Sequence, residues 1–342
     1  MHAIIPPVDK ALIKKELNKQ NFLRPTNKAG NEIYDLTAHE APNVMREIAR
    51  LRELSYRESG GSTGEEMDID GMDTMTVPYH QLIVWDPENE EIIGGYRYLW
   101  LRDCTFTEDG QPYITSAHLF RYTDYFINKY LPITIELGRA FVQPKYQSRE
   151  MGKKALFALD NLWDGLGAVV YNHPDVKYLI GKVTIYPAYD DTARNLIYAY
   201  LRRYCFDDKG LFMPYHPIDI SLEGQEMADD LFEGTNATEN FHILMKAVRA
   251  RGTTIPPMFS AYLNLTPSLR FFGNAVNDEL SNVYETGIMV DIDDVYEDKR
   301  RRYIGAYIDY ISSYISARRN RNRILKKERQ ERETRERNIT EN

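Results

Sequence analysis

The densest group of chemically useful residues lies between positions 133 and 156, in the sequence ITIELGRAFVQPKYQSREMGKKAL. A β-rich run there leads, through a turn marked by Pro144, into a helix that opens with polar and basic residues. This order brings backbone N–H groups and the positive end of a helix dipole to the end of a strand. The pattern favours binding of a phosphate-bearing ligand, although a simple strand–helix connection in any α/β domain has the same appearance.

Two charged residues, Glu136 and Arg139, lie on the strand that precedes this turn. Their odd separation puts them on opposite faces of a regular strand unless a bulge intervenes. Glu136 is a candidate general base or amine-orienting carboxylate, acting directly or through water. The alternative is a structural ion pair with a buried arginine. Arg97 and Arg139 are candidates for holding a carboxylate, because a planar guanidinium grips a carboxylate at two points.

The run ESGGSTGEEMDIDGMD, residues 58–73, is glycine-rich and acidic, which predicts a mobile loop. Its Asp70 and Asp73 could attract an ammonium group, or they could form only a solvated acidic turn.

Composition narrows the class of protein. Hydrophobic residues make up 43% of the 342, which is enough for a large core. No run approaches the roughly 20 apolar residues that cross a bilayer, and no cleaved signal pattern opens the chain, so we expect a cytoplasmic protein. Cys104 and Cys205 stand far apart without a CxxC or His pair, which predicts buried thiols. The sequence contains neither an HExxH metal-ligand motif nor the Gly-x-Ser-x-Gly nucleophile elbow of hydrolases.

Periodicity predicts alternating helices and strands, a mixed α/β order. Helices are expected over residues 44–57, 148–166 and 190–204, the first behind an Asn43 cap, with helical spacing also at 116–130. Strands are expected over 80–85, 92–101, 133–142, 178–185 and 286–291, the first two as a hairpin.

The turn after residue 142 resembles the phosphopantetheine loop of the GNAT acyltransferase superfamily, V-x-P-x-Y followed by Q/R-x-x-G-x-G/A. This chain has Val142, Pro144, Tyr146, Gln147 and Gly152. Glu150 replaces the first glycine of that loop, and its carboxylate should repel the pyrophosphate of coenzyme A. Because a carrier protein brings a pantetheine arm with one phosphate, the departure favours acyl carrier protein as donor.

Further motifs resemble the branch of GNAT enzymes that contains acyl-homoserine-lactone synthases and lyso-ornithine-lipid or glycine-lipid N-acyltransferases. That branch has a helix ending in L-R, a D-x-x-D pair, a hairpin strand closing on Arg, and E-x-x-R. This chain supplies Leu51-Arg52, Asp70 with Asp73, Gly95-Tyr96-Arg97, and Glu136 with Arg139. Residues 159–171 and 251–295 are similar to the aminolipid enzymes, as is YLIGKVTI, where Lys182 stands at a usually small or neutral position.

The resemblance implies a GNAT fold with a central mixed sheet and transfer of a 3-hydroxy fatty acyl group from acyl carrier protein to an amino acid, starting an aminolipid. The motifs do not separate glycine from ornithine as acceptor. Catalytic roles fall on Glu136, Arg139 and Arg97, and acceptor binding on Asp70, Asp73 and Arg52. The donor-binding residues are Phe141, Val142, Gln147, Arg149, Gly152 and Lys153, with backbone N–H groups near Phe141 and Val142 facing the oxyanion.

Synthesis of an N-acyl amino acid or lactone signal is the enzymatic alternative, and a non-catalytic membrane or interaction protein is the other. No bound cofactor, metal or nucleic acid is expected. A basic cluster could dock the carrier protein or could be only a solvated helix face. The cluster consists of Lys145, Arg149, Lys153 and Lys154.

The sequence patterns predict four parts of the chain. They are a leader that wraps the domain (1–42), the acyltransferase core (43–215), an extension (216–297) and a basic amphipathic helix with its tail (298–342). Between Asp298 and Arg337, 14 Lys and Arg face 6 Asp and Glu, although the whole chain has a net charge of −8. This helix could lie on an anionic membrane at the inner leaflet, or pack on its own domain or a second subunit. Its apolar stripe consists of Tyr303, Tyr307, Ile311 and Ile315.

Overall fold

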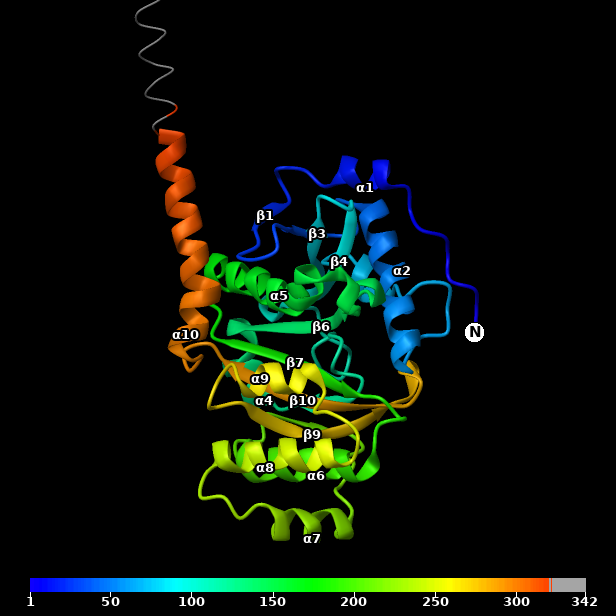
Figure 1. The fold of residues 1–342 in the computed structure, drawn as a ribbon, viewed down its shortest axis with the longest axis vertical. Coiled ribbons are helices and arrows are strands. Elements are labelled where there is room, and N and C mark those ends of the chain that lie inside the picture. The colour runs from blue at the N-terminus through cyan, green and yellow to red at the C-terminus, as the bar shows by residue number, and fades with distance from the viewer. Residues whose placement is uncertain (320, 322–342) are drawn as a thin grey trace, which may run out of the picture.

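An eight-stranded mixed sheet crosses the whole molecule in the order β1-β2-β3-β4-β6-β7-β10-β9 (Figure 1). The computed structural model describes residues 1–319 and 321, with the backbone alone at Arg149. Neighbouring strands are antiparallel except β6 and β7, which are parallel. The eight strands are β1 (Phe22–Pro25), β2 (Glu32–Leu36), β3 (His80–Asp86), β4 (Glu91–Trp100), β6 (Thr134–Val142), β7 (Tyr178–Ile185), β9 (Arg270–Asn277) and β10 (Val283–Asp291). The expected mixed α/β fold is confirmed.

Helices cover both faces of this sheet, and a small second sheet pairs β5 (Phe120–Tyr122) with β8 (Phe212–Pro214). Helix α6 packs at β9, and α7 and α8 pack on α6, below the sheet in Figure 1. The helices are α1 (Lys10–Glu16), α2 (Pro42–Ser59), α3 (Gly71–Thr74), α4 (Asp124–Lys129), α5 (Lys153–Asn172), α6 (Asp191–Tyr204), α7 (Leu222–Leu231), α8 (Ala237–Ala250), α9 (Pro257–Leu263) and α10 (Glu297–Arg300).

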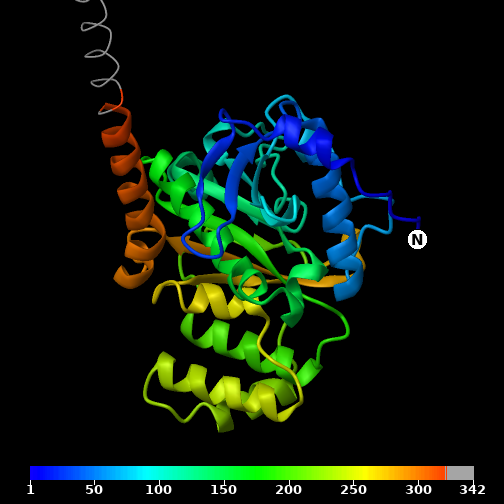
Figure 2. The same ribbon diagram turned by 45° about the horizontal axis from the view of Figure 1, so that its top comes forward.

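The side chains of β3 alternate between the two faces of the sheet, which allows one helix to pack on each face of this strand. Leu82 and Val84 share a buried cluster with α5, whereas Ile83 and Trp85 share one with α2. Successive strand residues point to opposite faces, so a continuous apolar run is buried on both. Figure 2 shows α2 and α5 on the two sides of this part of the sheet.

Two local expectations are wrong. Helix α2 begins at Pro42 instead of behind an Asn43 cap, and the Glu16 carboxylate accepts hydrogen bonds from the backbone N–H groups of Asn43 and Val44. A carboxylate from α1 thus satisfies the first turn of α2, where the helix dipole favours negative charge. The segment 116–130 forms β5 and the short α4 instead of one helix.

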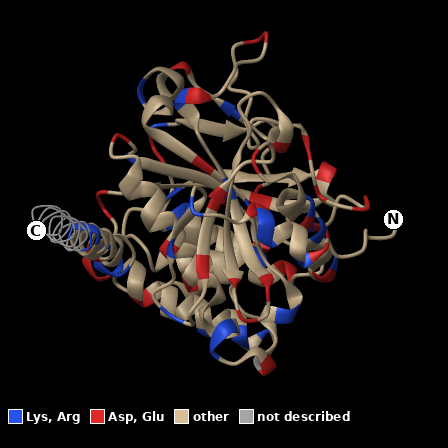
Figure 3. Ribbon diagram, turned by 90° about the horizontal axis from the view of Figure 1, so that it is seen from above, with Lys and Arg blue, Asp and Glu red and all other residues tan. Residues whose placement is uncertain are grey.

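The C-terminal helix leaves the body of the protein after one packed turn. Residues 306–319 continue α10 through a π-helical turn (Arg301–Gly305). Tyr307 is buried beside Tyr171 and under the Arg24 guanidinium, whereas Tyr314 and Ile315 are exposed on the part that projects from the molecule in Figure 1. The blue basic residues of the C-terminal helix are visible in Figure 3, and those within residues 306–319 are Arg318 and Arg319. The expected basic tail beyond residue 321 lies outside the described residues. No helix in the described ranges has both the length and the apolar character needed to cross a membrane.

The close approach of β4 and β6 depends on Gly94. A Cβ at this position would lie 2.3 Å from the Phe141 carbonyl oxygen and 3.1 Å from the Val142 Cα, both backbone atoms. Gly94→Ala should therefore push the two strands apart and reduce the free energy of unfolding by about 1–3 kcal/mol. Chemical denaturation measures this loss. Gly305→Ala is the control, because a Cβ at position 305 would lie 3.6 Å from its nearest heavy atom, the Arg301 Cγ. Equal stability of the two variants would contradict the expectation.

Candidate active site

Strands β6 and β7 pair at their beginnings and then separate. Their register runs from Thr134 opposite Tyr178 to Leu137 opposite Gly181, although β6 continues to Val142 and β7 to Ile185. Among the described residues, the β7-facing edge of the second half of β6 therefore has no strand partner. Such an open edge leaves backbone groups available to a ligand.

A bulge accompanies the separation. Between Gly95 and Arg97 of β4 the partner residues on β6 change from Phe141 to Gly138, so β6 has one extra residue there. Arg139 occupies the bulge with a φ of 48°. The bulge changes the direction of side chains after Glu136, and both Glu136 and Arg139 line the same cavity.

Three neighbouring cavities follow the gap between the strands. A central cavity of about 180 Å³ shares Arg139, Lys182 and Thr115 with a charged cavity of about 410 Å³. On its other side it shares Tyr56 and Met258 with a donor-side cavity of about 400 Å³. The central cavity thus lies between the charged and the donor-side cavities, where the strands separate.

Glu136 lines the central cavity and, within the described part of the chain, forms no ion pair with an arginine. Its Oε1 accepts hydrogen bonds from the Ser116 backbone N–H (2.8 Å) and hydroxyl, and its Oε2 from the Thr115 N–H (3.1 Å) and the Tyr79 hydroxyl. Four donors occupy the four lone-pair sites of the carboxylate. Glu136 therefore fixes the Thr115–Ser116 segment, in which Thr115 lines the charged cavity.

A network of buried charges surrounds Arg97. Its Nη1 lies 2.8 Å from Asp70 and 3.2 Å from Asp73, and its Nη2 donates to the Thr115 hydroxyl. Arg52 pairs with Asp73 at 3.1 Å, and both side chains are fully buried. Burial opposes ionisation of Asp73, but Arg52 and Arg97 outweigh it and hold its pKa below the usual range. Arg97, Arg52 and Asp73 are thus occupied with one another.

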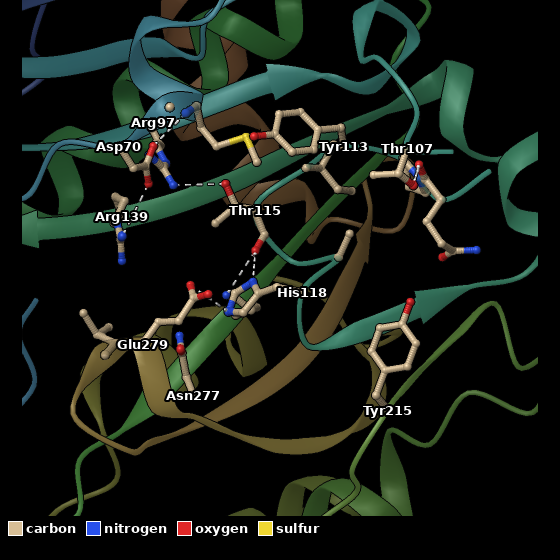
Figure 4. Close-up of a pocket in the computed structure, with 18 of the residues that line it drawn as sticks. Asp70, Arg97, Thr107, Tyr113, Thr115, His118, Arg139, Tyr215, Asn277 and Glu279 are labelled. Atoms are coloured by element: carbon tan, nitrogen blue, oxygen red, sulfur yellow. Dashed lines mark hydrogen bonds and ion pairs between the residues drawn. The ribbon is translucent and has the colours of Figure 1, made fainter. Parts of the chain in front are cut away.

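The acidic run is folded at its end, contrary to the expected loop. Asp70 caps α3 by accepting from the Met72 and Asp73 N–H groups, and Asp73 returns a bond to the Asp70 N–H. This capping box explains why only Asp70 of the pair reaches the cavity. Figure 4 shows Asp70 between Arg97 and Arg139. Arg139 also pairs with the buried Asp68 at 3.2 Å.

The residues that were expected to bind the donor lie where β6 ends and α5 begins. Phe141, Val142 and Gln147 line the donor-side cavity, and the Gln147 amide donates to the Val142 carbonyl at 2.7 Å. Gly152 precedes α5 with a φ of 54°, a conformation that favours glycine. Lys153 is exposed at the first turn of α5. The Arg149 side chain lies outside the described part of the structure.

Two members of the basic cluster are neutralised by the β3–β4 hairpin. Lys154 lies 2.6 Å from the buried Asp86 and 2.8 Å from Glu88, and Lys145 lies 2.6 Å from Glu91. Of the described side chains in the cluster, Lys153 is the one without such an ion pair.

Sequence reasoning missed several residues on the far side of the cavities. Lys182 lines both the charged and the central cavities, and Glu285 of β10 faces it at 3.9 Å. Burial lowers the pKa of Lys182, although Glu285 and Glu136 oppose that shift. His118 and Glu279 close the charged cavity below Thr115 in Figure 4. The unusual Lys182 within YLIGKVTI was the available signal, but its partner on β10 is 103 residues away.

Two named relatives match most of the chain. Glycine N(alpha)-acyltransferase from Bacteroides thetaiotaomicron is 49% identical over 309 residues, which cover 90% of this chain and 91% of that protein. Glycine N(alpha)-acyltransferase from Phocaeicola vulgatus is 46% identical over 308 residues, covering 90% and 94%. The acetyltransferase (GNAT) domain family matches residues 51–156. The chain belongs to the GNAT acyltransferase family of these two proteins. The resemblance seen in its motifs is confirmed, and the chain is an acyltransferase.

Two solved structures of a CoA-dependent acyl-homoserine lactone synthase also resemble this acyltransferase. The complexes, with SAM and isopentyl-CoA and with MTA, are 11% and 10% identical to it. Each comparison covers 83% of this chain and 90% of the other, with TM-scores of 0.34 and 0.33.

The buried charge network should make the acyltransferase sensitive to acid. The pKa values of Asp70 and Asp73 are lowered by folding from about 3.8, so their ionised forms stabilise the fold above that pH. This stabilisation is lost as the pH falls below about 4. Asp73→Asn leaves the buried Arg52 without its carboxylate partner and leaves Arg97 with Asp70 alone. This should cost about 3–5 kcal/mol at neutral pH and flatten the acid dependence.

Thermal unfolding between pH 3 and 7 measures both effects. Asp175→Asn is the control, because Asp175 forms a solvent-exposed pair with Arg102. If the Asp73→Asn variant has the same stability and the same acid dependence as the parent chain, the charge network does not stabilise the fold.

Proposed function

We propose that this acyltransferase moves a fatty acyl group from acyl carrier protein to the α-amine of glycine, the first step towards an aminolipid. The observation that carries the proposal is the row of three cavities from the donor loop to a charged pocket, in a chain whose two relatives are named for glycine. The apolar walls of the donor-side cavity suit a pantetheine arm and an acyl chain. They include Phe141, Leu159, Leu162 and Met258.

The reaction needs a neutral amine and a polarised thioester. The nitrogen lone pair attacks the thioester carbonyl carbon, a tetrahedral oxyanion forms, and the C–S bond breaks as the carrier thiol leaves with a proton. The unpaired edge of β6 after Leu137 offers backbone groups beside the place where the oxyanion would form.

Glu136 is our candidate acceptor of the amine proton, directly or through water. Each of its oxygens already accepts two hydrogen bonds, so this role requires a hydroxyl donor to rotate away. The Tyr79 and Ser116 hydroxyls can do so, whereas the backbone N–H groups of Thr115 and Ser116 are fixed.

The donor is tested by comparing a 3-hydroxyacyl chain on acyl carrier protein with the same chain on coenzyme A, with glycine as acceptor and mass spectrometry of the product. Glu150 is exposed in the loop before α5, where its charge would repel a pyrophosphate. Like charges about 4 Å apart in water cost about 1 kcal/mol, so kcat/KM should be at least roughly fivefold lower with coenzyme A. Glu150→Gly should recover that loss and leave the carrier-protein value unchanged. Tight, saturable use of acyl-CoA by the parent chain would contradict this donor.

The role of Glu136 is tested with Glu136→Gln. Loss of a general base should reduce kcat by about a hundredfold or more. The amide would also direct its NH₂ group at hydrogen-bond donors, so some loss of stability is expected. Ser116→Ala is the matched control, because it removes one donor to the carboxylate and keeps the carboxylate itself. If kcat falls in both variants only in proportion to their melting temperatures, Glu136 is an anchor and not a base.

A further inference from the structure

An amino acid carries two opposite charges, and its carboxylate needs a cation inside the protein. The cavities offer three Lys or Arg side chains among the described residues: Arg97, Arg139 and Lys182. Arg97 is held by Asp70 and Asp73, and Arg139 by Asp68 and Asp70. Two of the three cations are therefore engaged with carboxylates of the protein.

Lys182 differs because its partners are distant. Its Nζ lies 3.5 Å from the Thr115 carbonyl oxygen and 3.9 Å from the nearer Glu285 oxygen. An ammonium has three donors and normally binds at shorter distances. Glu285 is itself occupied, since it accepts from the Thr184 hydroxyl at 2.9 Å and from the Asn277 amide at 3.3 Å.

A cation with such weak pairing is unusual at this depth. The Lys182 side chain is 12% exposed, and burying an ammonium without close partners is costly. It lies on β7 one residue after Gly181, the last residue paired with β6, so it stands where the strands separate. From there it borders the charged cavity on one side and the central cavity on the other.

We propose that Lys182 binds the α-carboxylate of the amino acid acceptor and so directs the α-amine into the central cavity. This inference rests on the proposed function, because it names the group that recognises the acceptor in that same site. One carbon separates the carboxylate from the amine of an α-amino acid, so a carboxylate held at Lys182 keeps the amine beside Glu136 and Glu285, which line the same cavity. These two carboxylates attract the ammonium form before it loses its proton.

The inference makes Lys182 a determinant of acceptor specificity. Glycine should be preferred over glycinamide, which has the same amine and shape but no negative charge. A hydrogen bond to a charged group contributes enough to change affinity by about ten- to a hundredfold. The bulk of this preference should disappear when the ammonium is replaced.

The experiment uses the full chain with 3-hydroxyacyl carrier protein and measures kcat and KM for glycine and for glycinamide. Lys182→Met keeps an unbranched side chain of nearly the same length and removes the charge. We expect kcat/KM for glycine to fall about ten- to a hundredfold, mainly through KM, with glycinamide changed less than about twofold. Lys182→Arg should recover part of the preference. Lys177→Met is the matched control, since Lys177 lies just before β7 and pairs with Asp293 at the surface.

Stability must be measured in parallel, because Lys182→Met leaves Glu285 without a nearby cation. The double variant Lys182→Met, Glu285→Gln restores the charge balance and should show the same loss of preference. If Lys182→Met keeps the parent ratio of glycine to glycinamide, the assignment of Lys182 is wrong. If both acceptors lose kcat equally, Lys182 serves proton transfer and not carboxylate binding.

Failure of the proposed function has a different signature. The parent chain would then acylate neither glycine nor glycinamide from the carrier protein. Binding of ¹³C-labelled glycine to the parent chain and to Lys182→Met, followed by NMR without any donor, still decides the Lys182 assignment in that case. Equal binding by both proteins overturns it.

Discussion

The separation of β6 from β7 after the Leu137–Gly181 pair is the constraint on which the site depends. Parallel strands normally continue to exchange hydrogen bonds along their length, and each lost bond must be replaced. Here the β4–β6 bulge at Arg139 turns the second half of β6 away from β7. The resulting gap lies at the central cavity, between the charged and the donor-side cavities, and leaves a described backbone edge of β6 without a strand partner.

The buried ion pairs next to this gap fix the positions of the elements around it. Arg52, Asp73, Arg97 and Asp70 connect α2, α3 and β4, while Arg139 joins the network from the bulge itself. Such pairs contribute little net stability compared with apolar packing, but removing one partner is strongly unfavourable. Their effect is to fix the positions of groups around a cavity that must remain polar, which suits a site that receives a charged amino acid.

Glu136 and Lys182 illustrate two ways in which one site uses buried charge. Glu136 has every lone pair filled and thereby secures the Thr115–Ser116 wall. Lys182 has its nearest acceptor oxygen at 3.5 Å. A satisfied group shapes a pocket, whereas an under-satisfied group in the same pocket is available to a ligand. The two residues face the gap from the two strands that form it.

The sequence by itself determined the local elements and the family. Strand β7 was predicted with its bounds, the helix at α2 and the turn between β6 and α5 were recognised from spacing, and the spaced motifs identified the acyltransferase family. These features depend on neighbours within one turn or one strand, where side-chain type sets backbone preference. The weak predictions fell at 58–73 and 116–130, where capping by Asp70 and packing of aromatic side chains override local propensity.

Only the tertiary structure decided which charges meet. Nothing in the spacing of Asp70 and Asp73 indicates that one caps a helix and the other is sealed between two arginines. Lys182 and Glu285 are 103 residues apart, and they face each other because β10 inserts beside β7. Strand order follows from the best burial of apolar faces over the whole chain, so the partners of each buried charge are set by that packing and not by the residues around it in sequence.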